Sequence, residues 1–281
     1  MGTTPIVELA RAYGLHPRLW PLVLLTYSGD KLVGLQVCFV VDEGRTCIRR
    51  GGRILAELRG QGLLLQLREF ARKYVREHYP NLQRERFTTT RSLDQTKLLE
   101  YDILSYHVEK KFPAGGKISK TKTVEIQICS REHFSRVIPS DPVGTQLFPG
   151  NIIVVNWCPF EPIRSNIDHM LQESDGVFVE KCPDHISPKS LSFGTFSPCV
   201  KFAEWLAAVY TKDPVLFGAH ILHQLKLASE TINGDFIFIS FHDKDSTPLA
   251  RRVMEEQLQL KEHDWLSKRT LKLYEKDASK Y

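Results

Sequence analysis

The sequence predicts an α/β fold in two domains. At 281 residues the chain exceeds the usual size of a single domain, about 100–200 residues, and a hydrophobic fraction of 42% is enough for substantial cores. In the first third, β-favouring segments precede an amphipathic helical segment, and strand and helix patterns alternate again in the second half. We expect a short N-terminal extension (1–20), a first domain (21–112), a linker (113–118) and a second α/β domain (119–281).

A β-hairpin opens the first domain, because two β-favouring runs flank the turn signal around Gly29. The later helix is indicated by Leu63 and Leu67, which begin an apolar repeat at helical spacing, and Pro80 ends it. In chain order, the expected elements are a short helix over 7–13, strands over 21–27, 32–41 and 45–55, a helix over 62–78, a strand over 85–90, a short helix over 93–101 and a strand over 105–112.

The run Pro113-Ala114-Gly115-Gly116 marks the linker, because clustered proline and glycine residues favour turns and connections. Beyond it, strand and helix patterns alternate and no short-period repeat is visible. The expected strands are 123–128, 151–157, 177–180 and 236–241, and the expected helices are 165–173, 215–229 and 246–260.

The composition argues against several classes of function. The net charge is +5, but lysine and arginine are dispersed, so no nucleic-acid partner is expected, whereas a small polyanionic cofactor is compatible. The apolar run 19–25 contains Pro21 and is far shorter than the ~20 residues of a membrane span, so no membrane association is expected. The six cysteines form no C-x-x-C pair and the histidines form no H-E-x-x-H motif. We therefore expect no metal and a soluble cytoplasmic protein.

The residues Arg59-Gly60-Gln61-Gly62 lie where the predicted strand gives way to the predicted helix. Two glycines let a phosphate group approach the backbone closely, and the free N–H groups of a helix N-terminus carry partial positive charge. Arg59 adds a full positive charge beside them. This arrangement predicts a site for a phosphate-bearing cofactor. The alternative for such a string by itself is a tight turn.

This loop resembles the pyrophosphate loop of GNAT-type N-acetyltransferases, which has the pattern R/Q-x-x-G-x-G/A. Within that superfamily the chain is most similar to the vertebrate histidine N-acetyltransferase group, whose members carry a second domain. The likeness in the second domain rests on Ile152-Ile153, Asn156-Trp157, Pro159-Phe160, Pro162 and Ser165-Asn166-Ile167. The alternative for these second-domain residues is a packed turn that caps a helix.

The resemblance implies a mixed, mostly antiparallel sheet flanked by helices, and transfer of an acetyl group from acetyl-CoA to a small amine such as histidine or a related amino acid. A backbone N–H in the region of Arg53 to Leu55 would polarise the thioester, and Tyr101 would protonate the leaving thiolate, its alternative being an ordinary core aromatic. The residues implied for binding the cofactor are Ile54, Leu55, Arg59, Gly60, Gln61, Gly62, Leu63 and Leu64.

The chain departs from the family pattern at three places. Arg50 occupies the position of a glutamate that serves as base or water-positioning group, and a guanidinium cannot accept a proton. Leu64 replaces the small residue that ends the loop pattern. Only about 20 residues precede the hairpin, too few for the strand and two helices with which such domains open. The alternative function is therefore a catalytically impaired GNAT paralogue that serves as a CoA-binding or protein-interaction module.

Overall fold

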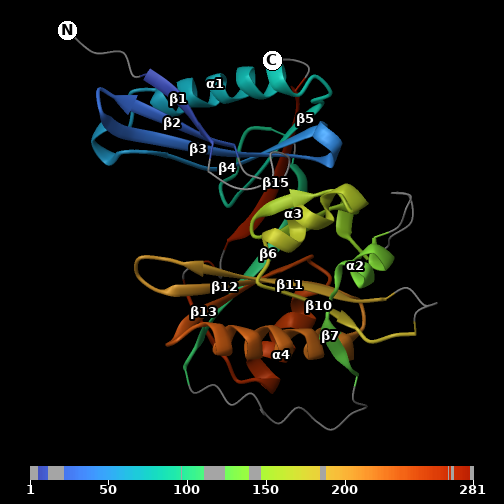
Figure 1. Cartoon of the computed structure of the whole chain (residues 1–281). Coiled ribbons are helices and arrows are strands. Elements are labelled where there is room, and N and C mark those ends of the chain that lie inside the picture. The colour runs from blue at the N-terminus through green and yellow to red at the C-terminus, as the bar shows by residue number, and fades with distance from the viewer. Residues whose placement is uncertain are drawn as a thin grey trace. The chain divides into compact units, whose positions relative to one another are not determined.

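The computed structural model describes residues 6–11, 22–95, 97–110, 124–138, 147–183, 188–264, 266 and 269–278. The chain forms two compact units (Figure 1). Unit 1 ends at Thr88 and takes up the chain again from Tyr274, and unit 2 comprises Thr89–Leu273. The predicted linker at 113–118 lies outside the described residues, so the predicted domain boundaries stay predictions.

Unit 1 is a sheet with one long helix on it. Its strands are β1 (Ile6–Arg11), β2 (Leu22–Ser28), β3 (Lys31–Val41), β4 (Thr46–Ile54), β5 (Arg84–Thr89) and the end of β15 (Thr270–Asp277). They lie in the order β1-β2-β3-β4-β5-β15, antiparallel from β1 to β4 and parallel between β4 and β5. The predicted hairpin and third strand are confirmed.

Helix α1 (Leu63–His78) supplies the core of unit 1, as its apolar repeat predicts. Its buried residues recur every four positions, so one stripe faces the sheet. That stripe packs with Leu24, Cys38 and Cys47 of β2, β3 and β4. The described cysteines are free thiols. The first residue of this buried stripe, Leu63, is also the first residue of α1, so the helix begins directly after the glycine loop.

Two predicted helices are wrong. Residues 7–13 are predicted as a helix, but Ile6–Arg11 forms β1, which pairs with β2 along its whole length. Residues 93–101 are predicted as a helix, but β6 (Lys97–Val108) begins there, and Tyr101, Ile103 and Leu104 are buried along it. A short apolar run is compatible with either element, and pairing with neighbouring strands decides for a strand here.

The main strands of unit 2 lie in the order β15-β6-β13-β12-β11-β10-β7. Its further elements are the strands β7 (Ile126–Ile128), β8 (Ile153–Val155), β9 (Cys158–Phe160), β10 (Gly176–Glu180), β11 (Leu191–Pro198), β12 (Ala203–Tyr210), β13 (Phe236–His242) and β14 (Lys261–Glu262), the helices α2 (Arg131–Val137), α3 (Ile167–Gln172), α4 (Pro214–Thr231) and α5 (Thr247–Arg251), and a π-helix over Arg252–Gln257. The sequence patterns do not predict strands β11 and β12. They do predict strand β13 and the three helical segments that correspond to α3, α4, and α5 with the π-helix.

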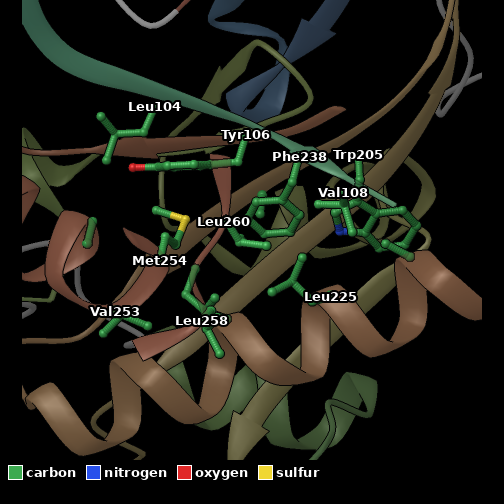
Figure 2. Packing of buried hydrophobic residues seen from close by; sticks show 14 of the residues in the cluster. Leu104, Tyr106, Val108, Trp205, Leu225, Phe238, Val253, Met254, Leu258 and Leu260 are labelled. Carbon is green, nitrogen blue, oxygen red and sulfur yellow. The ribbon is translucent and has the colours of Figure 1, made fainter. Parts of the chain in front are cut away.

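The core of unit 2 lies between the sheet and the helices that follow β12 and β13. Trp205 and Phe238, on the parallel strands β12 and β13, pack with Leu225 of α4 and Met254 of the π-helix (Figure 2). Both aromatic side chains are fully buried. The elements β12, α4 and β13 therefore form one rigid strand–helix–strand motif. None of the helices in the described ranges is long and apolar enough to cross a membrane.

Each unit thus contains one strand–helix–strand motif with parallel strands: β4-α1-β5 in unit 1 and β12-α4-β13 in unit 2. The pairs β1–β2, β2–β3 and β3–β4 in unit 1, and β6–β13, β11–β12, β10–β11 and β7–β10 in unit 2, are antiparallel. This confirms the mixed, mostly antiparallel sheet that the resemblance implies. The two motifs differ in how far their parallel strands remain paired, and this difference locates the candidate site.

Candidate acyl-CoA site

Strand β4 leaves its parallel neighbour β5 after the first third of its length. The two strands pair only from Thr46 to Ile48 of β4, although β4 continues to Ile54. Within the described residues, the β4–β5 ladder therefore ends at Ile48, and β4 continues beyond it without β5. Such an edge can pair with an extended, amide-containing ligand, in the way that a peptide adds to a sheet.

A β-bulge bends β4 in this open stretch. Leu35 pairs with Arg53 and Val37 with Arg50, so the single residue Gln36 faces two residues, Gly51 and Gly52. Gly51 has φ +66°, a conformation in which other residues are strained. The bulge changes the direction of the β4 backbone just before the glycine loop.

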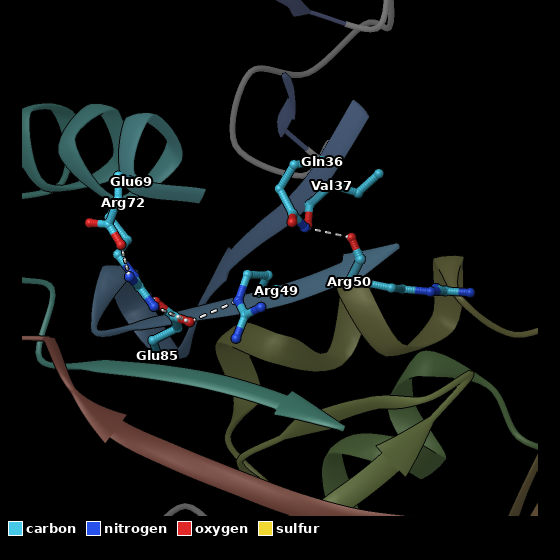
Figure 3. A network of polar contacts seen from close by, with 7 residues as sticks. All are labelled: Gln36, Val37, Arg49, Arg50, Glu69, Arg72 and Glu85. Carbon is cyan, nitrogen blue, oxygen red and sulfur yellow. Dashed lines mark hydrogen bonds and ion pairs between the residues drawn. The ribbon is translucent and has the colours of Figure 1, made fainter. Parts of the chain in front are cut away.

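The buried side chain of Gln36 holds this bulge. Its Nε2 donates to the carbonyl oxygens of Val37 and Arg50, at 2.9 and 2.8 Å (Figure 3). Sequence reasoning missed Gln36. The available signal was a lone amide residue within an apolar strand, and only the later pairing with a Gly-Gly step shows its role.

The predicted loop follows the end of β4 and the turn η2 (Ala56–Leu58). Gly60 and Gly62 have φ +81° and +76°, and a Cβ atom on either would meet no other atom within 4 Å. Gly62 is the N-cap of α1 and provides no side-chain cap. Within the described residues, no acceptor bonds the N–H groups of Gly60 through Leu64. The loop is exposed, so these N–H groups are able to donate to an anion.

The remaining residues predicted to bind the cofactor line the same strand–loop–helix junction. Arg59 Nε donates to the carbonyl oxygen of Ile54 at 3.2 Å, which ties the loop to the end of β4. The N–H of Leu55 donates to the Val33 carbonyl at 2.9 Å, so it has already found an acceptor in β3. Of Ile54, Leu55 and Arg59, only Arg59 carries a charge, and it adds a positive charge to the loop.

Leu64, which replaces a small residue of the family pattern, packs against the bulge. A Cβ atom on Gly52 would lie 2.9 Å from Leu64 Cδ1 and 2.7 Å from Gln36 Oε1. The leucine therefore occupies the space that a side chain at position 52 would take. Gln36, Gly52 and Leu64 form one packed contact that joins the bulge of β4 to the first turn of α1.

The carboxylates close to this site in sequence are engaged in ion pairs. Burial opposes ionisation of Glu85, but the hydrogen bond from Arg72 and the charge of Arg49 hold the pKa of its carboxyl below the usual value (Figure 3). The other three carboxylates also form ion pairs: Asp42 with Arg86 Nη1 at 3.3 Å, Glu43 with Arg45 Nη2 at 3.5 Å and Glu57 with Lys31 Nζ at 2.9 Å. None of the four therefore stands out as a general base.

Tyr101, the predicted proton donor, belongs to unit 2. It lies on β6 with 3% of its surface exposed, and its hydroxyl has no hydrogen-bond partner among the described residues. Burial, together with the nearby Tyr210 and Asp243, raises the pKa of this phenol well above its ordinary value. The hydroxyl is therefore protonated at neutral pH and is able to donate a hydrogen bond.

The strand–helix–strand motif of unit 2 has neither an early end of its parallel ladder nor an uncapped helix N-terminus. Strands β12 and β13 remain paired from Ala203 to Ala208 of β12. The N-terminus of α4 is capped by Asp213, whose carboxylate accepts from the N–H groups of Val215 and Leu216 at 2.7 and 3.2 Å. A carboxylate already fills the position that an anion would take. Of the two motifs, the one in unit 1 is open for a phosphate-bearing ligand.

Comparison with known proteins agrees with this architecture. The family model for the C-terminal part of histidine N-acetyltransferase matches residues 122–243. The chain is 24% identical over 160 residues to histidine N-acetyltransferase of Xenopus tropicalis, covering 52% of this chain but only 49% of the relative. It is 22% identical over 245 residues to that of Scomber australasicus, covering 79% and 72%. The chain thus spans about half of the first relative's length.

Among solved structures, a tandem GNAT protein from the clavulanic acid biosynthesis pathway superimposes with a TM-score of 0.56 at 10% identity, covering 94% of this chain and 85% of the other. A GCN5-related N-acetyltransferase from Sphaerobacter thermophilus gives 0.53 at 10% identity, covering 91% and 80%. These likenesses and the two strand–helix–strand motifs define the class: the protein has the GNAT fold. The family model and the curated relatives add a finer resemblance, to histidine N-acetyltransferases, as predicted, and the family-model match lies in residues 122–243.

Proposed function

We propose that the chain is an acyl-CoA-dependent N-acetyltransferase that binds acetyl-CoA at the glycine loop of unit 1. The observation that carries the proposal is the coincidence of three features: free N–H groups from Gly60 to Leu64, the positive charge of Arg59 and the open edge of β4. A pyrophosphate needs N–H donors and positive charge, and the amide-containing arm of CoA needs an extended backbone to pair with. The loop and the strand edge supply these needs next to each other in the chain.

In the proposed reaction, the nitrogen of a neutral amine attacks the thioester carbonyl, a C–N bond forms and the C–S bond breaks. The amine gives up a proton, and the leaving thiolate takes one. We assign the second proton transfer to Tyr101. The support for this role is the resemblance to the family, together with a hydroxyl that has no partner among the described residues and can donate; the raised pKa, which makes the phenol a weaker acid, does not add to it.

We further propose that the acceptor is the α-amino group of histidine or a related amino acid. The support is the likeness to histidine N-acetyltransferases from two vertebrates and the match of residues 122–243 to the family model.

The test is incubation of the purified protein with acetyl-CoA and a panel of free amino acids, with release of the free CoA thiol as the readout. We expect release that depends on the amino acid and is lost in Gly62→Asp, because a carboxylate on the loop repels the pyrophosphate. Release no faster than the hydrolytic background with every amine would refute the activity.

A second candidate function is a CoA-binding module without turnover. It is favoured by the ion pairs of Asp42, Glu43, Glu57 and Glu85, which leave no obvious base among these residues, and by Arg50 in place of the family's glutamate. This alternative predicts that acetyl-CoA raises the melting temperature of the protein while no thiol is released. Amine-dependent release would exclude it.

A further inference from the structure

A small cavity lies inside unit 1, between helix α1 and the sheet on which it packs. Its volume is about 20 Å³, and about 10–15 Å³ is enough for one water molecule. Four arginines line it, Arg49 of β4 and Arg68, Arg72 and Arg76 of α1, together with the carboxylate of Glu85 on β5. The cavity therefore has room for one monatomic ion but not for a phosphate group.

Positive charge exceeds negative charge around this cavity. Arginine stays protonated in proteins, so four positive charges face one carboxylate among the described lining residues. Both oxygens of Glu85 already accept, Oε1 from Arg49 Nε and Oε2 from Arg72 Nε, each at 2.8 Å (Figure 3). Arg68 and Arg76 form no ion pair with the residues that the structure describes. Their two charges are left without a carboxylate in direct contact.

Arg68 also has an unused donor. Its side chain is half-buried, but its Nε is fully buried and has no hydrogen-bond partner among the described residues. Arg76, in contrast, donates through Nη2 to the Ala278 carbonyl at 3.3 Å. Burial and the nearby charge of Arg49 lower the pKa of Arg68. A buried donor without an acceptor is costly, and more so on a charged group, so this position favours a negatively charged acceptor.

The lining of the cavity favours an anion over a water molecule. Its polar side chains are arginine N–H donors, two thiols and a carboxylate whose oxygens are already engaged. A water molecule needs acceptors for its own hydrogens and brings no negative charge, whereas an anion only accepts. Ala71, Val75 and Leu82 complete the wall with apolar atoms. Entering such a site costs an ion its hydration, which disfavours strongly hydrated anions.

We propose that this cavity binds one halide-sized anion, such as chloride or bromide, which accepts from Arg68 Nε and compensates the charge of the four arginines. Because the arginines lie on α1 and β4, the bound anion joins the helix to the sheet and stabilises unit 1. The site uses none of the N–H groups of the glycine loop. The inference therefore goes beyond the proposed function and can fail or succeed independently of it.

The experiment is thermal unfolding of the CoA-free full chain while chloride replaces gluconate at constant ionic strength, because gluconate is too large for the cavity. We expect chloride to raise the melting temperature of the original protein by at least about 2 °C. Arg68→Met should lose this rise. In gluconate this variant should melt no lower than the original protein, because methionine keeps an apolar stem and removes a charge that lacks a partner.

The matched control is Lys73→Met, which removes an exposed lysine that pairs with Glu77 on the same helix. This control should keep the full rise, and so should Gly62→Asp, which alters only the loop. An equal rise in the original protein and in Arg68→Met would overturn the proposal, as would no rise at all. A rise that is lost in Gly62→Asp would overturn it too, because the anion would then lie at the loop.

Bromide locates the site directly, because it scatters X-rays anomalously. In crystals of the original protein soaked in sodium bromide, we expect an anomalous peak in the cavity, within hydrogen-bonding distance of Arg68 Nε. Bromide peaks that lie only outside the cavity would overturn the proposal, whatever the melting temperatures show.

Discussion

The packed contact between the bulge and the helix makes Gly52→Ala an informative perturbation. The new methyl group would lie 2.7 Å from Gln36 Oε1 and 2.9 Å from Leu64 Cδ1, closer than real Cβ atoms approach other atoms. Gln36 cannot retreat without losing its hydrogen bonds to Val37 and Arg50. Overpacking of this kind costs about 1–3 kcal/mol, so we expect the free energy of unfolding to fall by that amount.

The measurement is urea denaturation of Gly52→Ala, Leu64→Ala and the double variant. Because Leu64→Ala removes one of the two close contacts, the double variant should be more stable than the sum of the single effects predicts, by about 0.5–3 kcal/mol. Gly218→Ala is the control, because its new methyl group would meet its nearest neighbour, Val253 Cγ2, at 4.0 Å. Unchanged stability in Gly52→Ala, or additivity with Leu64→Ala, would refute the proposed contact.

Three further predictions concern buried polar groups. Burial lowers the pKa of His220 and of His242 to about 3, so below pH 6.5 the unfolded state binds more protons and stability falls as the pH falls. Urea denaturation should show that the free energy of unfolding falls by about 2 kcal/mol per histidine between pH 7 and pH 5. Replacement of one of the two histidines by glutamine should roughly halve this total loss. A free energy of unfolding that does not change with pH would contradict the prediction. Arg86 is 3% exposed and pairs with the fully buried Asp42. Arg86→Met should therefore lower the free energy of unfolding by about 3–5 kcal/mol in the same assay, because it leaves a buried carboxylate without this partner. A decrease below about 1 kcal/mol would show that the pair is not buried as described. Tyr101→Phe should change the free energy of unfolding by less than about 1 kcal/mol, because the hydroxyl has no partner among the described residues. In the acetylation assay it should lower kcat more than it raises KM. An unchanged kcat would show that Tyr101 is not the proton donor.

The sequence was sufficient for those parts of unit 1 that depend on local signals. The hairpin follows from its turn residues and α1 follows from its four-residue apolar repeat, and the glycine loop was placed correctly between strand and helix. These features are set by residues within a few positions of each other. Local sequence patterns report on such features reliably.

Elements set by distant partners were missed. Strand β12 contains alanine, leucine and glutamate, which favour helices, and it forms a strand because β11 and β13 pair with it on both sides. The role of Gln36 depends on the Arg50 carbonyl, 14 residues away, and on a bulge that no local pattern announces. For Leu64, the sequence shows only that it replaces a small residue of the loop pattern, and its contact with Gly52 places it against the sheet.

The central claim is that the loop of unit 1 binds the pyrophosphate of CoA, and calorimetric titration of acetyl-CoA into Gly62→Asp tests it most directly. Gly29→Asp is the matched control, because Gly29 also has positive φ, +58° against +76°, and also has open space around it, but lies in the hairpin turn. Both substitutions carry the same charge and a similar backbone strain of about 1–2 kcal/mol. We predict that Gly29→Asp binds like the original protein and that Gly62→Asp binds at least about tenfold more weakly. Equal affinity of the two variants would contradict the claim.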